Sequence, residues 1–215
     1  AEVQARALNQ QRTAADTVNV VSADPIGAFP DPNAAEAASR IPGISITRDQ
    51  GEGRYVLIRG TEPRLNSMLI DGERIPAPEG DVRQIQLDAV PADQLQSIEV
   101  TKALTPDMDA DAIGGAVNLV TKQAVGKPTL LFSASGGYNA LQESGNQRLF
   151  TATAGRRFEA GRFGLLAGFS SSALHRGSEN FEAEYSDGYL GDFQLRDYQI
   201  DRDRNGFNAS ADVRL

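Results

Sequence analysis

The sequence contains no cysteine and no tryptophan, and His175 is its only histidine. Without cysteine, the chain forms neither a disulfide framework nor a thiolate site. Without several imidazoles or thiolates, it also lacks the usual ligands of a zinc site. A Ser-His or Cys-His nucleophile pair would have to depend on His175 alone. These absences exclude disulfide-stabilised folds and such zinc sites, and they argue against the common nucleophilic hydrolases.

Long hydrophobic runs are missing as well. Residues 164–169 form one of the most apolar stretches, and this run is far shorter than the roughly 20 apolar residues that a spanning helix needs. The N-terminus shows no basic stretch followed by an apolar one, so no signal peptide is visible. The sequence therefore excludes a helical membrane protein. Membrane-spanning β-strands stay possible, because they alternate along the chain and leave no hydropathy peak.

Positive charge is scarce: 21 Lys and Arg stand against 29 Asp and Glu, for a formal net charge of −8. This excess of acid argues against a nucleic-acid partner, which requires a basic surface. Apolar residues make up 40% of the 215 residues, which is enough for a core of ordinary size and argues against wholesale disorder. The length predicts one or two domains.

The chain changes character near Lys122. Residues 1–122 carry 11 basic and 18 acidic groups (11 − 18 = −7), and residues 123–215 carry 10 and 11 (10 − 11 = −1). Nine of the ten prolines precede Lys122, and none follows Pro128. We therefore expect two different kinds of structure on the two sides of Lys122.

The first part predicts a small mixed domain of short elements. A helix over residues 34–40 is expected after the cap Asp31-Pro32-Asn33. Asp71-Gly72 predicts a hairpin turn, and residues 91–95 predict one helical turn that starts at proline. The alternating and β-branched runs predict strands at residues 18–21, 44–47, 55–59, 68–70, 97–101 and 116–121.

The second part alternates apolar and polar residues in four segments of about ten residues, which is the pattern of outer-membrane strands. Gly, Ser, Thr, Asn and Arg form the other face, as a wet lumen requires. The apolar members are Leu130, Phe132, Ala134 and Tyr138; Phe150, Ala152, Ala154 and Phe158; Phe163, Leu165, Ala167 and Phe169; and Phe207, Ala209, Ala211, Val213 and Leu215.

The predicted connections between these segments alternate in length. Residues 140–146 join the first two segments, a tight turn at 159–161 joins the next two, and the charged stretch 176–205 is predicted to be a long loop. Short turns on one side and long loops on the other are typical of a transmembrane barrel. A soluble sandwich also alternates, so a soluble β-rich binding domain stays open as an alternative.

Several short signatures occur in a fixed order. They are Ile58-Arg59-Gly60, then Asn66 with Ile70-Asp71-Gly72, then Ile98-Glu99-Val100, and then Ile113-Gly114-Gly115-Ala116-Val117-Asn118-Leu119 with Thr121-Lys122. In this order, immediately before alternating strands, they resemble the TonB-dependent outer-membrane receptors. The resemblance covers the plug domain of that family and continues into the first barrel strands.

This resemblance implies a fold class and a domain organisation. The fold is an α+β plug domain, a small mixed sheet with short helices, followed by antiparallel strands of a transmembrane β-barrel. We expect an N-terminal linker at residues 1–16, the plug at 17–122 and the first barrel strands at 123–215. Twenty-two strands need roughly 220 residues before any loop, so we expect this chain to be a truncated part of a longer protein.

A finer resemblance concerns the solute. Ile26-Gly27 with Phe29-Pro30-Asp31, then Arg40-Ile41-Pro42-Gly43, then residues 48–54 are similar to a branch often associated with oligosaccharide uptake. Thr101-Lys102-Ala103-Leu104 replaces the Arg-Gly-Pro of many relatives and is similar to the same branch. The resemblance thus favours an oligosaccharide, with a ferric siderophore as the alternative.

The resemblance also implies a mechanism and partners. A receptor of this kind lies in the Gram-negative outer membrane, in contact with the lipid bilayer, and imports a scarce solute. A TonB-type inner-membrane protein supplies the energy by pairing with an N-terminal strand, the TonB box. Residues 16–20 superficially resemble such a box, but their position favours the first plug strand, and we expect the box upstream of Ala1. No cofactor, metal or enzymatic activity is implied.

Candidate site residues follow from the same resemblance. Apical loops at 48–54, 61–66 and 76–83 are expected to contribute to substrate binding, although a solvated loop face is the alternative for any one residue. Buried charges must be paired, so Arg59 and Glu99 are expected to lock the plug, unless both simply reach water. The loop candidates are Arg48, Asp49, Glu52, Arg54, Tyr55, Glu62, Arg64, Glu79 and Asp81, and the structural turns are Gly60, Asp71, Gly72, Gly114 and Gly115.

Two further acidic groupings are candidate sites. Residues 107–111 have calcium-loop spacing at the first three ligands but lack the glycine and glutamate that complete such a loop, so a helix cap ahead of Ala112 is expected instead. Glu182 and Glu184 raise the alternative of a carbohydrate-active enzyme. Such chemistry needs two carboxyl groups on either side of one bond, and two acids in a charged loop are weak evidence for it.

Overall fold

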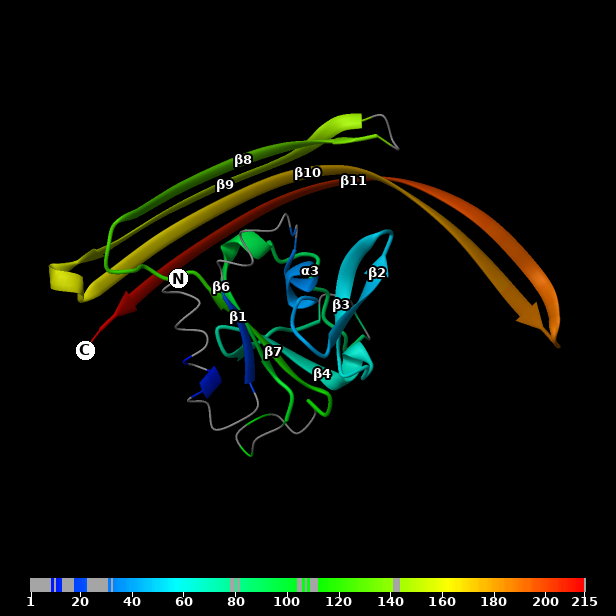
Figure 1. The fold of residues 1–215 in the computed structure, drawn as a ribbon, viewed down its shortest axis with the longest axis horizontal. Helices are drawn as coiled ribbons and strands as arrows, with labels where there is room; N and C mark the ends of the chain where they lie inside the picture. The colour runs from blue at the N-terminus through cyan, green and yellow to red at the C-terminus, as the bar shows by residue number, and fades with distance from the viewer. Residues whose placement is uncertain are drawn as a thin grey trace.

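The chain folds into two units of different construction (Figure 1). The computed structural model describes residues 9, 11–12, 18–22, 31, 33–77, 80, 82–103, 106, 108, 112–140 and 144–214. Short strands and short helical segments make up an N-terminal unit, residues 18–121, and four long strands follow within residues 129–213. The long strands form a curved sheet that arches over the N-terminal unit (Figure 1).

A five-stranded mixed sheet forms one layer of the N-terminal unit, and its strand order is β1-β6-β7-β4-β5. The β4 and β7 strands pair in parallel, and the other neighbours are antiparallel. The bounds are β1 (Val18–Ser22), β4 (Asn66–Ile70), β5 (Glu73–Arg74), β6 (Leu95–Thr101) and β7 (Gly115–Thr121).

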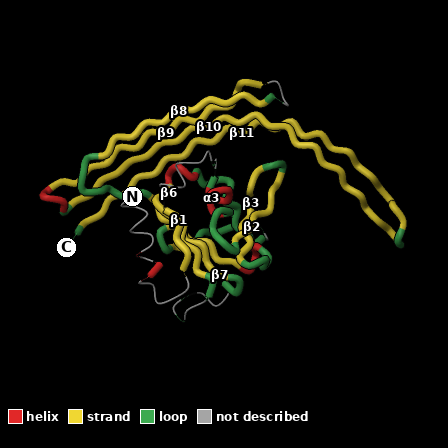
Figure 2. Tube along the Cα trace, viewed as in Figure 1, coloured by secondary structure: helices red, strands yellow, loops and turns green. Residues whose placement is uncertain are grey.

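A separate hairpin packs with a short helix beside this sheet (Figure 2). It consists of β2 (Ile44–Asp49) and β3 (Glu52–Ile58), and the helix is α3 (Ala34–Ala38). The Asn33 side chain accepts a hydrogen bond from the Glu36 backbone N–H at 3.0 Å, so the predicted cap is present. The four alanines of α3 are fully buried, and their small side chains let the helix approach the hairpin closely.

The core lies between these layers and follows the strand period. Ile98 and Val100 of β6 and Val117 and Leu119 of β7 are fully buried, two residues apart on each strand, as one face of a sheet requires. The predicted turn at residues 91–95 is a 3-10 segment, η2 (Ala92–Gln94), and a second such segment, η1 (Pro63–Leu65), precedes β4. The strands, the helix and the turns expected before Lys122 are therefore present, but the helix expected to start at Ala112 is not, because residues 112–114 form a turn that leads into β7.

Arg59 is a correction to the predicted strand over 55–59. The β3 strand ends at Ile58, whose carbonyl accepts the Thr61 N–H at 3.0 Å and closes a turn. Within this turn Arg59 has a φ of +53° and is exposed. The prediction included Arg59 because the β-branched and aromatic residues before it indicate a strand, and composition alone does not mark the residue at which the backbone turns.

The long strands form a four-stranded antiparallel sheet in the order β11-β10-β9-β8. Their bounds are β8 (Thr129–Asn139), β9 (Ser144–Phe158), β10 (Phe163–Ser186) and β11 (Tyr189–Val213), and the segment η3 (Glu159–Gly161) joins β9 to β10. The first three predicted segments lie within these strands, and the fourth does so as far as Val213, whereas Leu215 lies outside the described residues. Among the described residues, no helix is both long enough and apolar enough to cross a membrane.

The predicted loop over 176–205 is wrong. The β10 and β11 strands pair continuously except for one bulge after Glu184, and a two-residue turn at Asp187 and Gly188 connects them. Both turn residues have positive φ, +52° and +82°, as a tight hairpin turn requires. The alternation weakens here because Glu179 and Asp197 interrupt the apolar face and Ile200 interrupts the polar one, so the period of two is hard to recognise in the sequence.

The two faces of the long sheet differ in chemistry. In β10 the even-numbered Leu166 and Ser170 are buried, and Ser170 contacts Gln94 of the N-terminal unit. The odd-numbered Phe163, Leu165 and Phe169 are exposed on the opposite face. A soluble sandwich would cover these apolar side chains with a second sheet, and among the described residues no sheet packs on this face.

Candidate functional site

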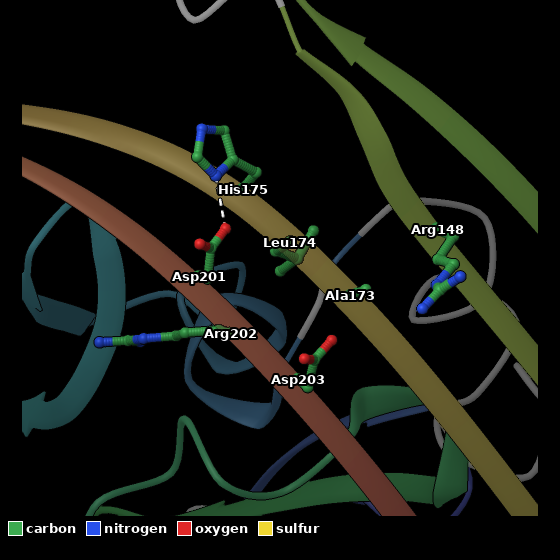
Figure 3. A pocket seen from close by; sticks show the side chains of 7 residues that line it. All are labelled: Arg148, Ala173, Leu174, His175, Asp201, Arg202 and Asp203. Atoms are coloured by element: carbon green, nitrogen blue, oxygen red, sulfur yellow. Dashed lines mark hydrogen bonds and ion pairs between the residues drawn. The ribbon is translucent and has the colours of Figure 1, made fainter.

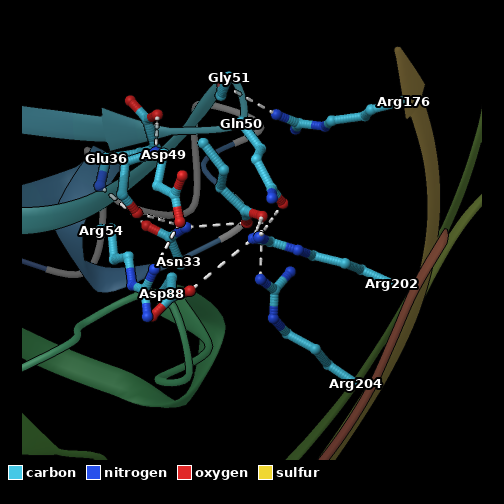
Figure 4. A network of polar contacts seen from close by, with 12 residues as sticks. Asn33, Glu36, Asp49, Gln50, Gly51, Arg54, Asp88, Arg176, Arg202 and Arg204 are labelled. Atoms are coloured by element: carbon cyan, nitrogen blue, oxygen red, sulfur yellow. Dashed lines mark hydrogen bonds and ion pairs between the residues drawn. The ribbon is translucent and has the colours of Figure 1, made fainter. Parts of the chain in front are cut away.

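The N-terminal unit is joined to the long sheet by a buried carboxylate (Figure 4). Glu52, the first residue of β3, is only 1% exposed. Its side chain accepts hydrogen bonds from Arg202 at 2.5 Å, from Arg204 at 2.9 Å and from the Asn33 amide at 2.9 Å. One carboxylate therefore ties the β2–β3 hairpin both to the cap of α3 and to β11. We call this cluster of Glu52, Arg202 and Arg204 the Glu52 joint.

The geometry of the Glu52 joint follows from the strand period. Arg202 and Arg204 are two residues apart on β11, so both project from the face toward the N-terminal unit. Asp88 adds a second carboxylate, 3.7 Å from the Arg202 guanidinium. Burial by itself raises the pKa of Glu52, but the hydrogen bonds and charges of Arg204, Arg202 and Asn33 outweigh it and lower that pKa below its ordinary value. The carboxylate is therefore ionised at neutral pH.

The tip of the β2–β3 hairpin makes further contacts with the long sheet. The Gly51 carbonyl accepts a hydrogen bond from Arg176 at 3.3 Å, and the Gln50 side chain accepts one from Arg202 at 3.3 Å. Arg176 lies on β10 and Arg202 on β11. Both strands of the long hairpin therefore hold the apical hairpin of the N-terminal unit.

A second junction lies where the chain passes from one unit to the other. The Lys122 ammonium donates to the Asp93 carbonyl, and the Lys122 carbonyl accepts from Ser210 at 3.3 Å. Gln94 donates to Ser170 at 3.1 Å. A Cβ on Gly206 would lie 2.5 Å from the Gln94 amide nitrogen and 3.0 Å from the Pro91 ring, so glycine at this position lets η2 lie close to the sheet.

Arg157 fixes the linker that follows Lys122. Its side chain is almost fully buried, donates to the Ala124 carbonyl at 3.0 Å and to the Gly161 carbonyl at 2.8 Å, and pairs with Asp212. The linker is thus held to β9, to the η3 turn and to β11. The N-terminal unit is thus held to the sheet at two places, at the β2–β3 hairpin through the Glu52 joint and at the linker after Lys122 through Arg157.

The predicted substrate residues of the first apical loop lie close together but contact mainly one another. Arg54 pairs with Asp49 and stacks over the Tyr55 ring at 5.3 Å, and Arg48 pairs with Glu36 at 3.0 Å. Glu52 was expected to line the loop surface, and this is wrong because the side chain is buried in the joint. The loop is therefore braced by its own ion pairs.

The other predicted site residues are placed as follows. Arg64 pairs with Glu62 at 2.5 Å on the surface, and Glu79 and Asp81 lie outside the described residues. So do Asp107, Asp109 and Asp111, on which the calcium-loop spacing depends, and within the described part of the chain no cluster of three or more His, Cys, Asp or Glu could hold a metal ion.

The expected lock of Arg59 and Glu99 is not brought together. Arg59 is exposed in the turn after β3, whereas Glu99 lies on β6 and accepts a hydrogen bond from Asn118 at 3.2 Å. No described contact joins the two residues. The charged lock that the structure contains is the Glu52 joint, which the sequence analysis missed. The available signal was the pair of arginines two residues apart, on the same parity as Asn208 and Ser210.

The predicted turn residues occupy turns and close approaches. Asp71 accepts hydrogen bonds from the Thr121 backbone and hydroxyl at 2.8 and 2.6 Å, and the Gly72 N–H donates to Asn118 at 2.9 Å. Gly60 and Gly72 both have positive φ. At Gly114 a Cβ would lie 2.1 Å from the Asn66 side-chain oxygen, and at Gly115, with φ +132°, it would lie 2.5 Å from the Thr101 carbonyl.

These features together define a class of protein. A folded domain is held by charged contacts against the polar face of a curved antiparallel sheet, and the opposite face of that sheet is apolar. This is the organisation of a barrel whose lumen is filled by a plug.

Comparison with known proteins identifies the family. Residues 10–116 match the TonB-dependent Receptor Plug Domain. The chain belongs to the TonB-dependent receptors and carries their plug domain followed by antiparallel strands.

The relatives are transporters and receptors. The chain is 28% identical over 169 residues to the vitamin B12 transporter of Vibrio vulnificus, covering 74% of this chain and 27% of that protein. Its fold is similar to the ferric citrate transporter (TM-score 0.64, 20% identity, 96% of this chain and 33% of that one). It is also similar to a siderophore receptor from Acinetobacter baumannii (TM-score 0.60, 18% identity, 77% and 25%). The chain thus spans about a third or less of these proteins.

The Glu52 joint can be tested by an isosteric change. Glu52→Gln keeps the size of the side chain, leaves Arg204 without its counter-charge and leaves Arg202 with only the more distant Asp88 carboxylate. Removing one partner of a buried ion pair costs about 3–5 kcal/mol. We expect faster proteolysis of the N-terminal unit in the detergent-solubilised protein.

The matched control for this change is Glu62→Gln, because Glu62 pairs with Arg64 on the surface. Exposed pairs contribute at most about 1 kcal/mol, so this variant should be cleaved at the wild-type rate. Equal protease sensitivity of Glu52→Gln and the wild type would contradict the assigned role of the joint.

The lowered pKa of Glu52 predicts an acid-dependent step. A carboxylate whose folded pKa is depressed stabilises the fold fully above its ordinary value, here 4.5, and loses that contribution as the pH falls through the lower folded pKa. Urea midpoints followed by circular dichroism at pH 7, 5 and 3 should fall more steeply below pH 4.5 in the wild type than in Glu52→Gln. Parallel pH profiles would contradict this assignment.

Proposed function

We propose that this chain is the plug and the first barrel strands of an energy-coupled importer of the outer membrane. The observation that carries the proposal is the inverted sheet: its apolar side chains face outward, and its polar face holds a folded domain through the Glu52 joint. Residues 17–122 act as the plug that occludes the lumen, and residues 123–215 act as membrane-spanning strands. Residues 1–16 link the plug to an upstream TonB box.

Transport in this proposal depends on movement of the plug by an inner-membrane partner. A TonB-type protein pairs with the N-terminal segment, and strand pairing supplies main-chain hydrogen bonds that withstand force. The Glu52 joint and the Lys122 junction resist that force where the plug meets the sheet. No catalytic role is proposed, and Glu182, once a candidate acid, pairs with Arg196 at 2.9 Å.

We further propose an oligosaccharide as the solute. The inner face of the long hairpin beyond the plug carries a polar cluster centred on Arg196, which donates to Glu182 at 2.9 Å and to the Tyr198 hydroxyl at 3.2 Å. Gln194 accepts from the same guanidinium at 2.5 Å. Planar polar groups beside an aromatic ring suit the hydroxyl groups and faces of sugars, and the mixed charges give no single-sign field that would attract a highly charged chelate.

A ferric siderophore is the second candidate, because one of the structurally similar proteins is a siderophore receptor. The two solutes can be separated in cells that express the complete receptor. We expect uptake of labelled oligosaccharide, but not of ferric siderophore, and we expect a protonophore to abolish it. Uptake that is indifferent to the protonophore would overturn energy coupling, and uptake of ferric siderophore alone would overturn the choice of solute.

The polar cluster on the hairpin gives a second prediction. Glu182→Gln removes a charged hydrogen-bonding group from the inner face, and the loss of one such bond weakens binding by about tenfold. We expect the half-saturation concentration for uptake to rise by that factor while the maximal rate stays unchanged. Glu179 lies on the same strand with the opposite parity, so Glu179→Gln should leave uptake unchanged. Equal effects of the two variants would contradict the inner-face site.

A further inference from the structure

A row of charged residues interrupts the apolar outer face of the long sheet, and beyond it Phe181, Phe193 and Leu195 are again exposed on the same face. Phe150, Phe169 and Phe207 are exposed on that face, and the Phe150 and Phe169 ring centroids are 6.4 Å apart. Two residues farther toward the hairpin tip on β9, and four farther on β11, the same face carries Arg148 and Asp203. Along each strand the side chains therefore change from aromatic to ionic over two to four residues, or roughly 7–14 Å.

The strand register places these charges on one face. Ala173 of β10 pairs with Arg148 on one side and with Asp203 on the other, and His175 pairs with Asp201. Directly paired residues project from the same side of a sheet, and His175 has the parity of the exposed Phe169. Leu174 and Arg202 have the opposite parity, and Arg202 reaches Glu52 on the inner side.

A cavity of about 560 Å³ lies among these residues (Figure 3). It occurs at the step where β9 stops pairing with β10, since the last β9–β10 pair is Arg148 with Ala173. The small Ala173 side chain separates the guanidinium from the carboxylate. The residues that line the cavity are Arg148, Ala173, Leu174, His175, Asp201, Arg202 and Asp203.

The charges in this row are not equivalent. The His175 ring lies 2.5 Å from the Asp201 carboxylate. By contrast, within the part of the chain that the structure describes, neither Arg148 nor Asp203 forms a hydrogen bond or ion pair, and both are exposed. Neighbouring strands lie about 4.8 Å apart, and β10 lies between β9 and β11. The Arg148 and Asp203 backbones are therefore about 10 Å apart. The row thus offers an unpaired guanidinium directly above an aromatic surface.

We propose that this row binds the phosphate of a membrane lipid, with Arg148 as the phosphate ligand and the surface of Phe150, Phe169 and Phe207 in contact with the acyl chains. The inference rests on the proposed function for its membrane setting. A guanidinium pairs with phosphate through two parallel hydrogen bonds. The nearby Asp203 repels a free phosphate dianion, so the apolar contact with the acyl chains is what makes a lipid phosphate the favoured occupant.

The test uses the complete receptor in neutral detergent micelles. Dioctanoyl phosphatidic acid is titrated and its binding is measured by native mass spectrometry, with dioctanoylglycerol and inorganic phosphate as comparison ligands. We expect Arg148→Gln to weaken phosphatidic acid binding by about tenfold and Asp203→Asn to tighten it severalfold, because that change removes a repulsive charge. Arg64→Gln, which makes the same charge change on the plug, should have no effect.

The outcomes separate the possible explanations. Binding that Arg148→Gln leaves unchanged, or an Asp203→Asn variant that binds phosphatidic acid no tighter, would overturn the site. Inorganic phosphate bound as tightly as phosphatidic acid would show a simple anion site and would also overturn it. Energy-dependent uptake is measured on the same proteins. A wild-type receptor that takes up solute but does not bind phosphatidic acid would refute this inference alone. A wild-type receptor that binds phosphatidic acid but shows no energy-dependent uptake would refute the proposed function.

Discussion

The structure depends on one ionised carboxylate held between two guanidinium groups. Glu52 belongs to the apical hairpin of the plug, and Arg202 and Arg204 belong to the last of the described strands. A charge taken out of water must be paired or it destabilises the fold by several kcal/mol. The hairpin, the capped helix α3 and the sheet are therefore placed relative to one another by a single electrostatic requirement, since Asn33 both caps α3 and donates to Glu52.

This requirement is compatible with the sheet only because the sheet is inverted. Its apolar outer face carries the Phe and Leu side chains, and its polar face presents arginine, serine and asparagine to the plug. The contacts across that boundary are mostly hydrogen bonds and ion pairs, such as Gln94 to Ser170 and Arg176 to the Gly51 carbonyl. A polar boundary holds the two units in register while leaving groups that water can solvate if the units separate.

Much of the fold was predictable from local sequence patterns, and the joint was not. The Asn33 cap, the Asp71-Gly72 turn and the parity of the long strands follow from interactions within a few residues. The partners of Glu52 lie 150 and 152 residues away, and an acid beside a Gln-Gly turn ordinarily faces water. The outer half of the long hairpin was predicted as a loop because charged residues such as Glu179 and Asp197 interrupt the apolar face that carries Phe181 and Leu195. Arg59 was placed in a strand because the composition before it is that of a strand.

The unbroken inner part of the β10–β11 ladder has a mechanical consequence. From its bulge near the turn down to Val213 the two strands stay paired, and the Arg202 and Arg204 positions lie on this same stiff ribbon. The turn at Asp187 and Gly188 is about 45–50 Å along the strand from Arg202. Because the pairing is continuous over this length, we expect a load on the outer part of the hairpin to be transmitted along the ladder to Arg202 and Arg204, and so to the contact with Glu52.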